Sequence, residues 1–389
     1  MKFYIEIDAL DALVSSLKKA SPSISSIAII TDTTVEKLYG QSVLEKLENA
    51  DFAVGIFSFE AGEASKIRKT KEQIEDALIA AGFDKASAII ALGGGVVLDL
   101  AGFIAATYMR GVRLYSVPTT LLSMVDACYG GKNGVNTDQA KNMIGSIHFP
   151  QGIFIDPSLL KTLNETERLS GMAEVVKHAL IQDKEFAQTL FNFDFKDNAA
   201  IKDLIQKNLK IKAHIVDASI QEKASQMRDQ LNFGHTLGHA IEALFKYEIS
   251  HGYGVFVGMA FANFLSLKLG HMPEKEFEEM DRLIHHIFVS LPAFMILIKE
   301  TLESKENLDF VIELMLRDKK NEGNQIRFVL LEGVGKVHTQ LEYDVSDEGL
   351  DLKEKQKICF THAVDQNVVK SSLNEFFMRY AGYENASVR

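Results

Sequence analysis

Cysteine and proline are scarce in this sequence, and tryptophan is absent: its 389 residues include 2 Cys, 6 Pro and no Trp. Cys128 and Cys359 cannot form a disulfide framework, and no Cys-x-x-Cys pair is present to hold a metal. Any bound metal must therefore be held by histidine and carboxylate side chains. With no low-complexity run and no fixed-period repeat, the sequence also argues against a long disordered linker or a repeat architecture.

Long hydrophobic runs are missing as well. No uninterrupted apolar stretch reaches the roughly 18 residues of a membrane span. The first residues, MKFYIEIDALDALVSSLKK, are amphipathic and lack the apolar core of a signal peptide. We therefore expect a cytoplasmic protein with no membrane partner.

Positive charge is in deficit, since 42 Lys and Arg stand against 53 Asp and Glu, for a net charge of −11. This balance argues against nucleic acid as a partner. An anionic substrate remains compatible with it, provided that a few lysines and arginines converge in one pocket.

Two kinds of pattern divide the chain. The first part alternates β-branched apolar runs with segments of helical period, which predicts strands near 27–31 and 53–59 and a helix over 66–81. After Asp156 and Pro157 long helical segments dominate, apart from a strand signal at 325–331. We expect a Rossmann-like α/β nucleotide-binding domain over 1–158, followed by a mostly α-helical metal- and substrate-binding domain over 159–389.

The apolar run at 88–92 predicts a strand, and after it the glycine turn of Gly93, Gly94 and Gly95 leads into a segment of helical period. Such a turn lets backbone N–H groups and a helix N-terminus approach a phosphate. The pattern GGGVVLD lacks the G-x-G-x-x-G spacing, so a tight turn that needs positive φ is an equally good interpretation. Asp99 lies in the first helical turn, where it would cap the helix or reach a ribose hydroxyl.

Histidines and one acid suggest a metal site. His235 and His239 lie four residues apart in LNFGHTLGHAIEA, so a helix projects both from one face, and His251 follows sixteen residues after His235. Glu174 is the candidate carboxylate, because an acid inside the apolar segment GMAEVVKHALI is costly unless it is paired or bound to metal. The alternative is a surface salt bridge with Lys177.

The stretch 110–145 is polar, with lysines and asparagines beside glycines. These residue types suit phosphate and carboxylate groups, and a solvated surface loop is the alternative.

Taken together, these segments resemble the 3-dehydroquinate synthases of the sugar-phosphate cyclase family, which are distantly related to metal-dependent polyol dehydrogenases. The resemblance runs from about residue 32 to 331, and its most specific parts are GGGVVLDLAGF, VPTTLLSMVDACYGGKNGVN, KNMIG, GMAEVVKHALI and LNFGHTLGHAIEA. It implies a homodimeric lyase of the shikimate pathway that uses NAD and Zn²⁺ or Co²⁺.

The resemblance also implies roles for matching positions. Metal ligation is implied for Glu174, His235 and His251, whereas His239 matches an active-site histidine. NAD contacts are implied for Asp32, Glu63, Lys66, Gly94, Gly95, Asp99, Thr119, Thr120, Lys141 and Thr162. Substrate contacts are implied for Arg110, Asp126, Lys132, Asn142, Lys177, Arg228, Asn232 and Lys320, with Lys319 the less favoured neighbour.

The implied substrate is a phosphorylated keto acid, 3-deoxy-D-arabino-heptulosonate 7-phosphate, and the implied products are 3-dehydroquinate and phosphate. Transient oxidation at C5 acidifies the C6 proton, phosphate leaves by elimination, hydride returns to C5, and an intramolecular aldol reaction closes the ring. NAD ends as it began.

Two departures from the family pattern keep other interpretations open. Tyr253 stands where an acidic residue usually follows the His-Gly pair, and the stretch between Lys212 and Arg228 is about two residues longer, so Glu222 is left without a role. A cyclase that acts on sedoheptulose 7-phosphate or glucose 6-phosphate becomes the better interpretation if Arg228 and Asn232 bind no carboxylate. A polyol dehydrogenase that releases NADH and a non-catalytic NAD-binding protein are more distant alternatives. The segment near 340–357 resembles an insertion and is assigned no role.

Overall fold

The computed structural model describes residues 2–20, 23–137, 141–221, 225–316, 324–343 and 356–381. They form two units, one of residues 1–171 with 194–209 and the other of 172–193 with 210–389. Residues 159–171 and 194–209 thus pack with the α/β unit. The domain boundary near residue 158 stays a prediction.

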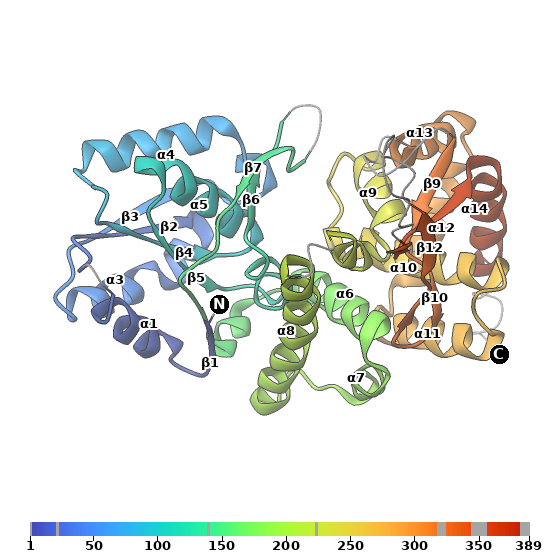
Figure 1. The fold of residues 1–389 in the computed structure, drawn as a ribbon, viewed down its shortest axis with the longest axis horizontal. Coiled ribbons are helices and arrows are strands. Elements are labelled where there is room, and N and C mark those ends of the chain that lie inside the picture. Colours follow the sequence, from blue (N-terminus) through green and yellow to red (C-terminus); the bar gives the residue numbers. More distant parts are fainter. Residues whose placement is uncertain are drawn as a thin grey trace, which may run out of the picture. The chain divides into compact units, whose positions relative to one another are not determined.

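A six-stranded parallel sheet, in the order β1-β8-β5-β4-β2-β3, forms the centre of the first unit (Figure 1). Its strands are β1 (Lys2–Ile5), β2 (Ile27–Asp32), β3 (Val54–Phe59), β4 (Ala88–Gly93), β5 (Arg113–Pro118) and β8 (Gly152–Ile155). The strands expected near 27–31, 53–59 and 88–92 are confirmed. The edge strand β1 was not predicted, because its four residues merge into the amphipathic helix that follows.

Helices cover both faces of this sheet, with α1 (Ala9–Lys18) and α3 (Gln41–Glu48) on one and α4 (Arg68–Ala80) and α5 (Gly95–Thr107) on the other (Figure 1). Leu13 of α1 packs in one core with Ile29 and Ile90 of the central strands. Burial on both faces explains why the central strands are continuous apolar runs instead of alternating ones. Short helices complete the unit: α2 (Thr33–Val35), η1 (Glu36–Gly40), η2 (Glu63–Ser65), η3 (Tyr108–Arg110), η4 (Ser123–Ala127) and η5 (Pro157–Thr162).

The strand order reverses between β2 and β4. The chain continues from β2 to β3 on one side and from β4 to β5 on the other, so the carboxyl ends of β2 and β4 flank a topological switch point. In open parallel sheets ligands bind in the crevice at such a point. Asp32 ends β2 and the glycine turn follows β4, so both candidate cofactor-binding segments meet there.

The polar stretch at 110–145 is ordered where the structure describes it. It contains η4 and an antiparallel hairpin of β6 (Lys132–Val135) and β7 (Ile144–Ile147). The helix expected over 66–81 begins at Arg68 instead, because the 3-10 turn η2 and two non-helical residues precede it.

The second unit is mostly helical, as predicted. Two helices, α6 (Glu165–Gln182) and α8 (Asn198–Gln221), belong to both units. The others are α7 (Lys184–Thr189), η6 (Leu190–Asn192), η7 (Ser225–Asn232), α9 (His235–Leu244), α10 (His251–Lys268), α11 (Glu274–Ile287), α12 (Leu291–Leu302), α13 (Lys305–Leu316) and α14 (Gln366–Ala381). Among the described helices none is by itself long and apolar enough to cross a membrane; α11 and α12 pass that test together, as a pair bent by 100°.

Three antiparallel strand pairs accompany these helices: β9 (Gln325–Phe328) with β14 (His362–Asp365), β10 (Leu331–Gly333) with β11 (Lys336–Val337), and β12 (Gln340–Tyr343) with β13 (Gln356–Cys359). The strand signal at 325–331 therefore corresponds to β9 and the start of β10. The remaining strands have two to four residues, too few for a periodicity to show.

Helices α9 and α10 pack backbone to backbone. A Cβ atom added to Gly238 would lie 2.9 Å from the carbonyl oxygen of Gly254, and one added to Gly258 would lie 1.8 Å from that of Gly234. Only glycine fits such an approach. This packing holds the histidines of α9 close to the N-terminus of α10.

Candidate functional site

Three elements of the second unit bring one acid and two histidines together. Helix α6 carries Glu174, α9 begins with His235, and α10 begins with His251. The Oε1 atom of Glu174 lies 3.4 Å from Nε2 of His235 and 3.4 Å from Nε2 of His251. One ligand atom from each residue lies within 4.8 Å of the others, a spacing that a single metal ion can bridge.

The carboxylate of Glu174 is buried and ionised. The residue is 1% exposed, and neither oxygen has a hydrogen-bond partner among the described residues. Burial by itself raises the pKa of Glu174, but the ammonium group of Lys177, which contacts Oε2, and the nearby histidines hold that pKa well below its usual range. Lys177 neutralises this buried carboxylate at Oε2, and Oε1 faces the two histidines, where a metal ion would add a second cation.

His235 presents a lone pair to this carboxylate. Burial and the charge of Lys177 lower the pKa of His235 to about 3, so its ring is neutral. Its Nδ1 lies 3.0 Å from the carbonyl oxygen of Phe233, which fixes the proton on Nδ1 and leaves Nε2 as the acceptor. This is the tautomer that a metal ligand needs.

His251 is held by a second acid. Its Nδ1 donates to Oε1 of Glu242 at 2.8 Å. Burial lowers the pKa of His251, but its contacts with Glu174 and Glu242 outweigh burial and raise the pKa to about 10. The resulting positive charge balances the buried acids, and a divalent cation between the same atoms would supply it equally well. The donor set thus fits zinc or a similar ion.

The sequence pattern does not single out Glu242, although this acid stands in the apolar segment that also carries His235 and His239. The structure buries it. Tyr253, which occupies the position of the expected acid, packs its ring against Phe288 at 4.5 Å between centroids. The carboxylate beside His251 is therefore supplied from α9 instead of from α10.

His239 lies at the exposed edge of this group. Its ring centroid is 5.1 Å from that of His235 and 6.0 Å from that of His251. The set of His239, Glu242 and His251 also has ligand atoms within 4.8 Å of one another. Glu242 is hydrogen-bonded to Nδ1 of His251, whereas Oε1 of Glu174 faces Nε2 of both His235 and His251 at 3.4 Å, so the geometry favours Glu174, His235 and His251.

The other predicted substrate residues of this unit are placed as follows. Lys177 is 2% exposed and ion-paired with Glu174, which excludes the interpretation of that pair as a surface salt bridge. Arg228 donates from Nε to Oγ of Ser219 at 2.7 Å, and Asn232 ends η7. Glu222, Lys319 and Lys320 lie outside the described residues.

The glycine turn of the first unit keeps side chains away from the N-terminus of α5. None of Gly93, Gly94 and Gly95 has positive φ, so the interpretation as a positive-φ turn is wrong. A Cβ atom on Gly93 would lie 2.5 Å from the Val97 side chain, and one on Gly94 would lie 3.2 Å from Thr120. The close packing therefore leaves no room for a side chain at Gly93 and little at Gly94.

A buried lysine organises the residues around this turn. Lys66 is 4% exposed, forms an ion pair with Asp99 and donates to Oδ1 of Asn142 at 2.6 Å. Asp99 thus pairs with Lys66, and the N-cap of α5 is Gly94, without a side-chain cap. The structure brings together a predicted substrate residue, Asn142, and two predicted NAD residues.

The remaining predicted NAD residues lie within the same unit. Asp32 accepts from the backbone N–H groups of Thr34 and Val35. Glu63 accepts from Nδ2 of Asn136, and the buried Oγ1 of Thr119 has no hydrogen-bond partner in the described part of the chain. Thr120 hydrogen-bonds with Ser123, Thr162 ends η5 and hydrogen-bonds with Tyr39, and Lys141 is half-buried.

Three predicted substrate residues also belong to the first unit. Arg110 is exposed at a left-handed backbone position, with φ of 61°, just before β5. Asp126 lies in η4, and Lys132 is exposed at the start of β6.

Two family models and a relative match most of this chain. The family model described as "3-dehydroquinate synthase N-terminal" matches residues 56–170, and the model described as "3-dehydroquinate synthase C-terminal" matches residues 171–321. The 3-dehydroquinate synthase of Thermoanaerobacter sp. (strain X514) is 40% identical over 340 residues, which cover 86% of this chain and 92% of that protein.

Solved structures share the fold. A 2-deoxy-scyllo-inosose synthase, crystallised with carbaglucose-6-phosphate, NAD⁺ and Co²⁺, has a TM-score of 0.77 at 24% identity and covers 96% of each chain. The 2-epi-5-epi-valiolone synthase of Streptomyces hygroscopicus subsp. jinggangensis 5008, with NAD⁺ and Zn²⁺ bound, has a TM-score of 0.78 at 23% identity and covers 97% of each chain.

Proposed function

This chain belongs to the 3-dehydroquinate synthase family, and we propose that it converts 3-deoxy-D-arabino-heptulosonate 7-phosphate to 3-dehydroquinate and inorganic phosphate. The observation that carries the proposal is the buried, ionised carboxylate of Glu174 facing His235 and His251. Such a set serves a metal-assisted reaction at a hydroxyl or carbonyl group. Two histidines that served only for packing would not require a buried, ionised carboxylate facing them.

We assign the metal to Glu174, His235 and His251, and NAD to the switch point of the parallel sheet. Bound there, the metal ion would act as a Lewis acid at the C5 oxygen while NAD would accept and return the C5 hydride. Asp32, Asp99 and Lys66 orient the cofactor at the glycine turn. Glu63, Gly94, Gly95, Thr119, Thr120, Lys141 and Thr162 complete its proposed surroundings.

The chain's own residues handle protons and charge. His239 is exposed beside the proposed ligands, where it can take up the C5 hydroxyl proton. Lys177 adds a buried positive charge next to Glu174, which favours developing negative charge on the substrate oxygen. We assign Arg110, Asp126, Lys132, Asn142, Arg228, Asn232 and Lys320 to the substrate's phosphate, carboxylate and hydroxyl groups.

The test is phosphate release by the metal-loaded protein with catalytic NAD, with the product identified by mass. We expect phosphate and 3-dehydroquinate from the carboxylated substrate, and no turnover of sedoheptulose 7-phosphate or glucose 6-phosphate. Turnover of a carboxylate-free sugar alone would contradict the assignment and would indicate a different sugar-phosphate cyclase.

Glu242 orients His251, so the Glu242→Gln variant is expected to bind zinc more weakly. Loss of a carboxylate behind a ligating histidine typically costs roughly 10–100-fold in metal affinity. Competition with a chromophoric chelator measures the change. Glu248→Gln, an exposed acid just beyond the same helix, is the control and should leave the affinity unchanged. Equal zinc affinities in Glu242→Gln and Glu248→Gln would show that Glu242 does not support the metal site.

Lys66 is expected to support NAD binding, since its ammonium group joins Asp99 to Asn142. In Lys66→Met we expect the KM for NAD to rise by at least about 10-fold, the size expected from losing a buried charge-assisted hydrogen bond. Lys69→Met removes an exposed lysine two residues into α4 and should leave KM unchanged. A normal KM in Lys66→Met would argue against this cofactor position.

We further propose that the enzyme works as a homodimer in the cytoplasm. Light scattering on the purified full chain should give twice the mass of 43.3 kDa, and a monomer with full activity would contradict the dimer.

A further inference from the structure

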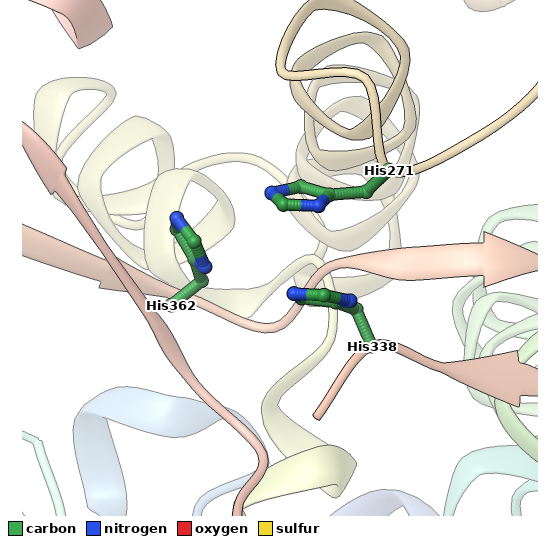
Figure 2. A group of neighbouring side chains, drawn as sticks. All are labelled: His271, His338 and His362. Carbon is green, nitrogen blue, oxygen red and sulfur yellow. The ribbon is translucent and has the colours of Figure 1, made fainter. Parts of the chain in front are cut away.

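Three histidines outside the proposed active site converge in the second unit (Figure 2). His271 follows the end of α10, His338 follows β11, and His362 is the first residue of β14. All three are half-buried, and one ring nitrogen of each lies within 4.8 Å of the others.

The rings face one another closely. The centroids of His271 and His338 are 4.0 Å apart in a stacked arrangement, and that of His362 lies 4.8 Å from His271 and 5.7 Å from His338 (Figure 2). Lone pairs that converge in this way do not stabilise one another. A proton shared by one pair of rings, or a cation held by all of them, makes the arrangement favourable.

Polar groups behind two of the rings orient them. Oε1 of Glu332 accepts from Nδ1 of His338 at 3.1 Å, which leaves Nε2 as the lone pair. The side-chain amide nitrogen of Gln340 lies 2.5 Å from Nδ1 of His362, so this amide orients the His362 ring. A carboxylate or amide behind a histidine is the usual support of a metal ligand.

Charge in the cluster also suits a cation. Burial, followed by the neighbouring rings, lowers the pKa of both His271 and His362. Among the described residues, Glu332 is the one acid in contact with these rings. It also pairs with Lys336, and Arg327 is a nearby positive charge.

We propose that His271, His338 and His362 bind a divalent transition-metal ion, with Zn²⁺ as the expected ion. Three imidazoles suit zinc, cobalt, nickel and copper, and they do not suit magnesium or calcium, which prefer oxygen ligands. This site is distinct from Glu174, His235 and His251, because α10 carries His251 at its first residue and ends three residues before His271. Its 18 residues span about 27 Å, so one ion cannot serve both sets.

The role of this site is structural. The ion joins the end of α10 to the segments around β11 and β14, whose own strand pairs have two to four residues. Metal bound at such a site adds directly to folding stability.

The test is a Co²⁺ titration of the full chain after chelator treatment, followed by visible absorption and by metal analysis after dialysis against Zn²⁺. We expect two equivalents for the wild type, one for His362→Asn, one for His235→Asn, and none for the double variant. His286→Asn, an exposed histidine of α11, is the matched control and should retain two. One equivalent in the wild type, absent from His235→Asn, would overturn the proposal.

A second measurement tests the proposal even if the His362→Asn variant does not fold. Glu332→Gln leaves all three histidines in place and should weaken this site by roughly 10–100-fold while the other equivalent binds normally. In the His235→Asn background, Zn²⁺ should also raise the unfolding temperature. No change in affinity in Glu332→Gln, together with no thermal shift, would contradict a metal at this cluster. None of these measurements depends on catalysis, so they are separate from the proposed activity.

Discussion

Glu174→Gln is expected to abolish phosphate release, with a loss of more than about 100-fold, because losing a direct ligand must exceed the 10–100-fold cost of losing a group behind one. The substitution keeps the shape of the side chain and removes the charge that faces His235 and His251. Zinc content after dialysis should fall by one equivalent in parallel with activity.

The same substitution also affects folding, because Lys177 is buried against this carboxylate. Breaking a buried ion pair by removing one partner costs about 3–5 kcal/mol of unfolding free energy. Urea denaturation measures this cost. The control is Glu165→Gln, an exposed acid in the first turn of the same helix, which should change stability by less than about 1 kcal/mol and leave activity intact. Full activity and a full metal equivalent in Glu174→Gln would exclude Glu174 as a ligand.

Gly258→Ala is expected to destabilise the second unit by about 3 kcal/mol, at the upper end of the usual cost of overpacking. A Cβ atom at this position would lie 1.8 Å from the backbone oxygen of Gly234, which cannot rotate away as a side chain can. Helices α9 and α10 must then move apart, and they carry His235 and His251. We expect lower stability and lower zinc affinity together.

Gly40→Ala is the matched control for this prediction. Gly40 has helical backbone angles, and the nearest atom to an added Cβ is Cγ of the flexible Glu36 side chain, at 3.2 Å. Alanine there should be neutral or stabilise the protein by up to about 1 kcal/mol. A Gly258→Ala variant as stable as the wild type would contradict the close backbone packing of α9 and α10.

Much of the fold can be predicted from local sequence. The buried strands β2 and β4 are continuous apolar runs bounded by polar or glycine-containing turns, and the half-buried edge strand β3 is rich in apolar residues, so each is visible in its own residues. Features that depend on distant contacts are not visible in this way. Residues 194–209 pack with the α/β unit although their pattern is helical like that of their neighbours, and the strands of two to four residues leave no period to read.

The candidate site shows the same limit. The spacing of His235 and His239 predicts a shared helix face, but not which of the two faces Glu174; that choice comes from the acids of α6 and α9 and from the carbonyl of Phe233. His271, His338 and His362 come from three separate elements and form no motif, so no sequence signal joined them.

The most direct test of the central claim compares phosphate release with NADH accumulation in one reaction, with NAD far below the substrate concentration. The proposed function predicts complete conversion of 3-deoxy-D-arabino-heptulosonate 7-phosphate to one equivalent each of phosphate and 3-dehydroquinate, with no lasting rise in NADH. NADH that accumulates in step with turnover, or a reaction that stops when NAD is used up, would contradict it and indicate a dehydrogenase instead.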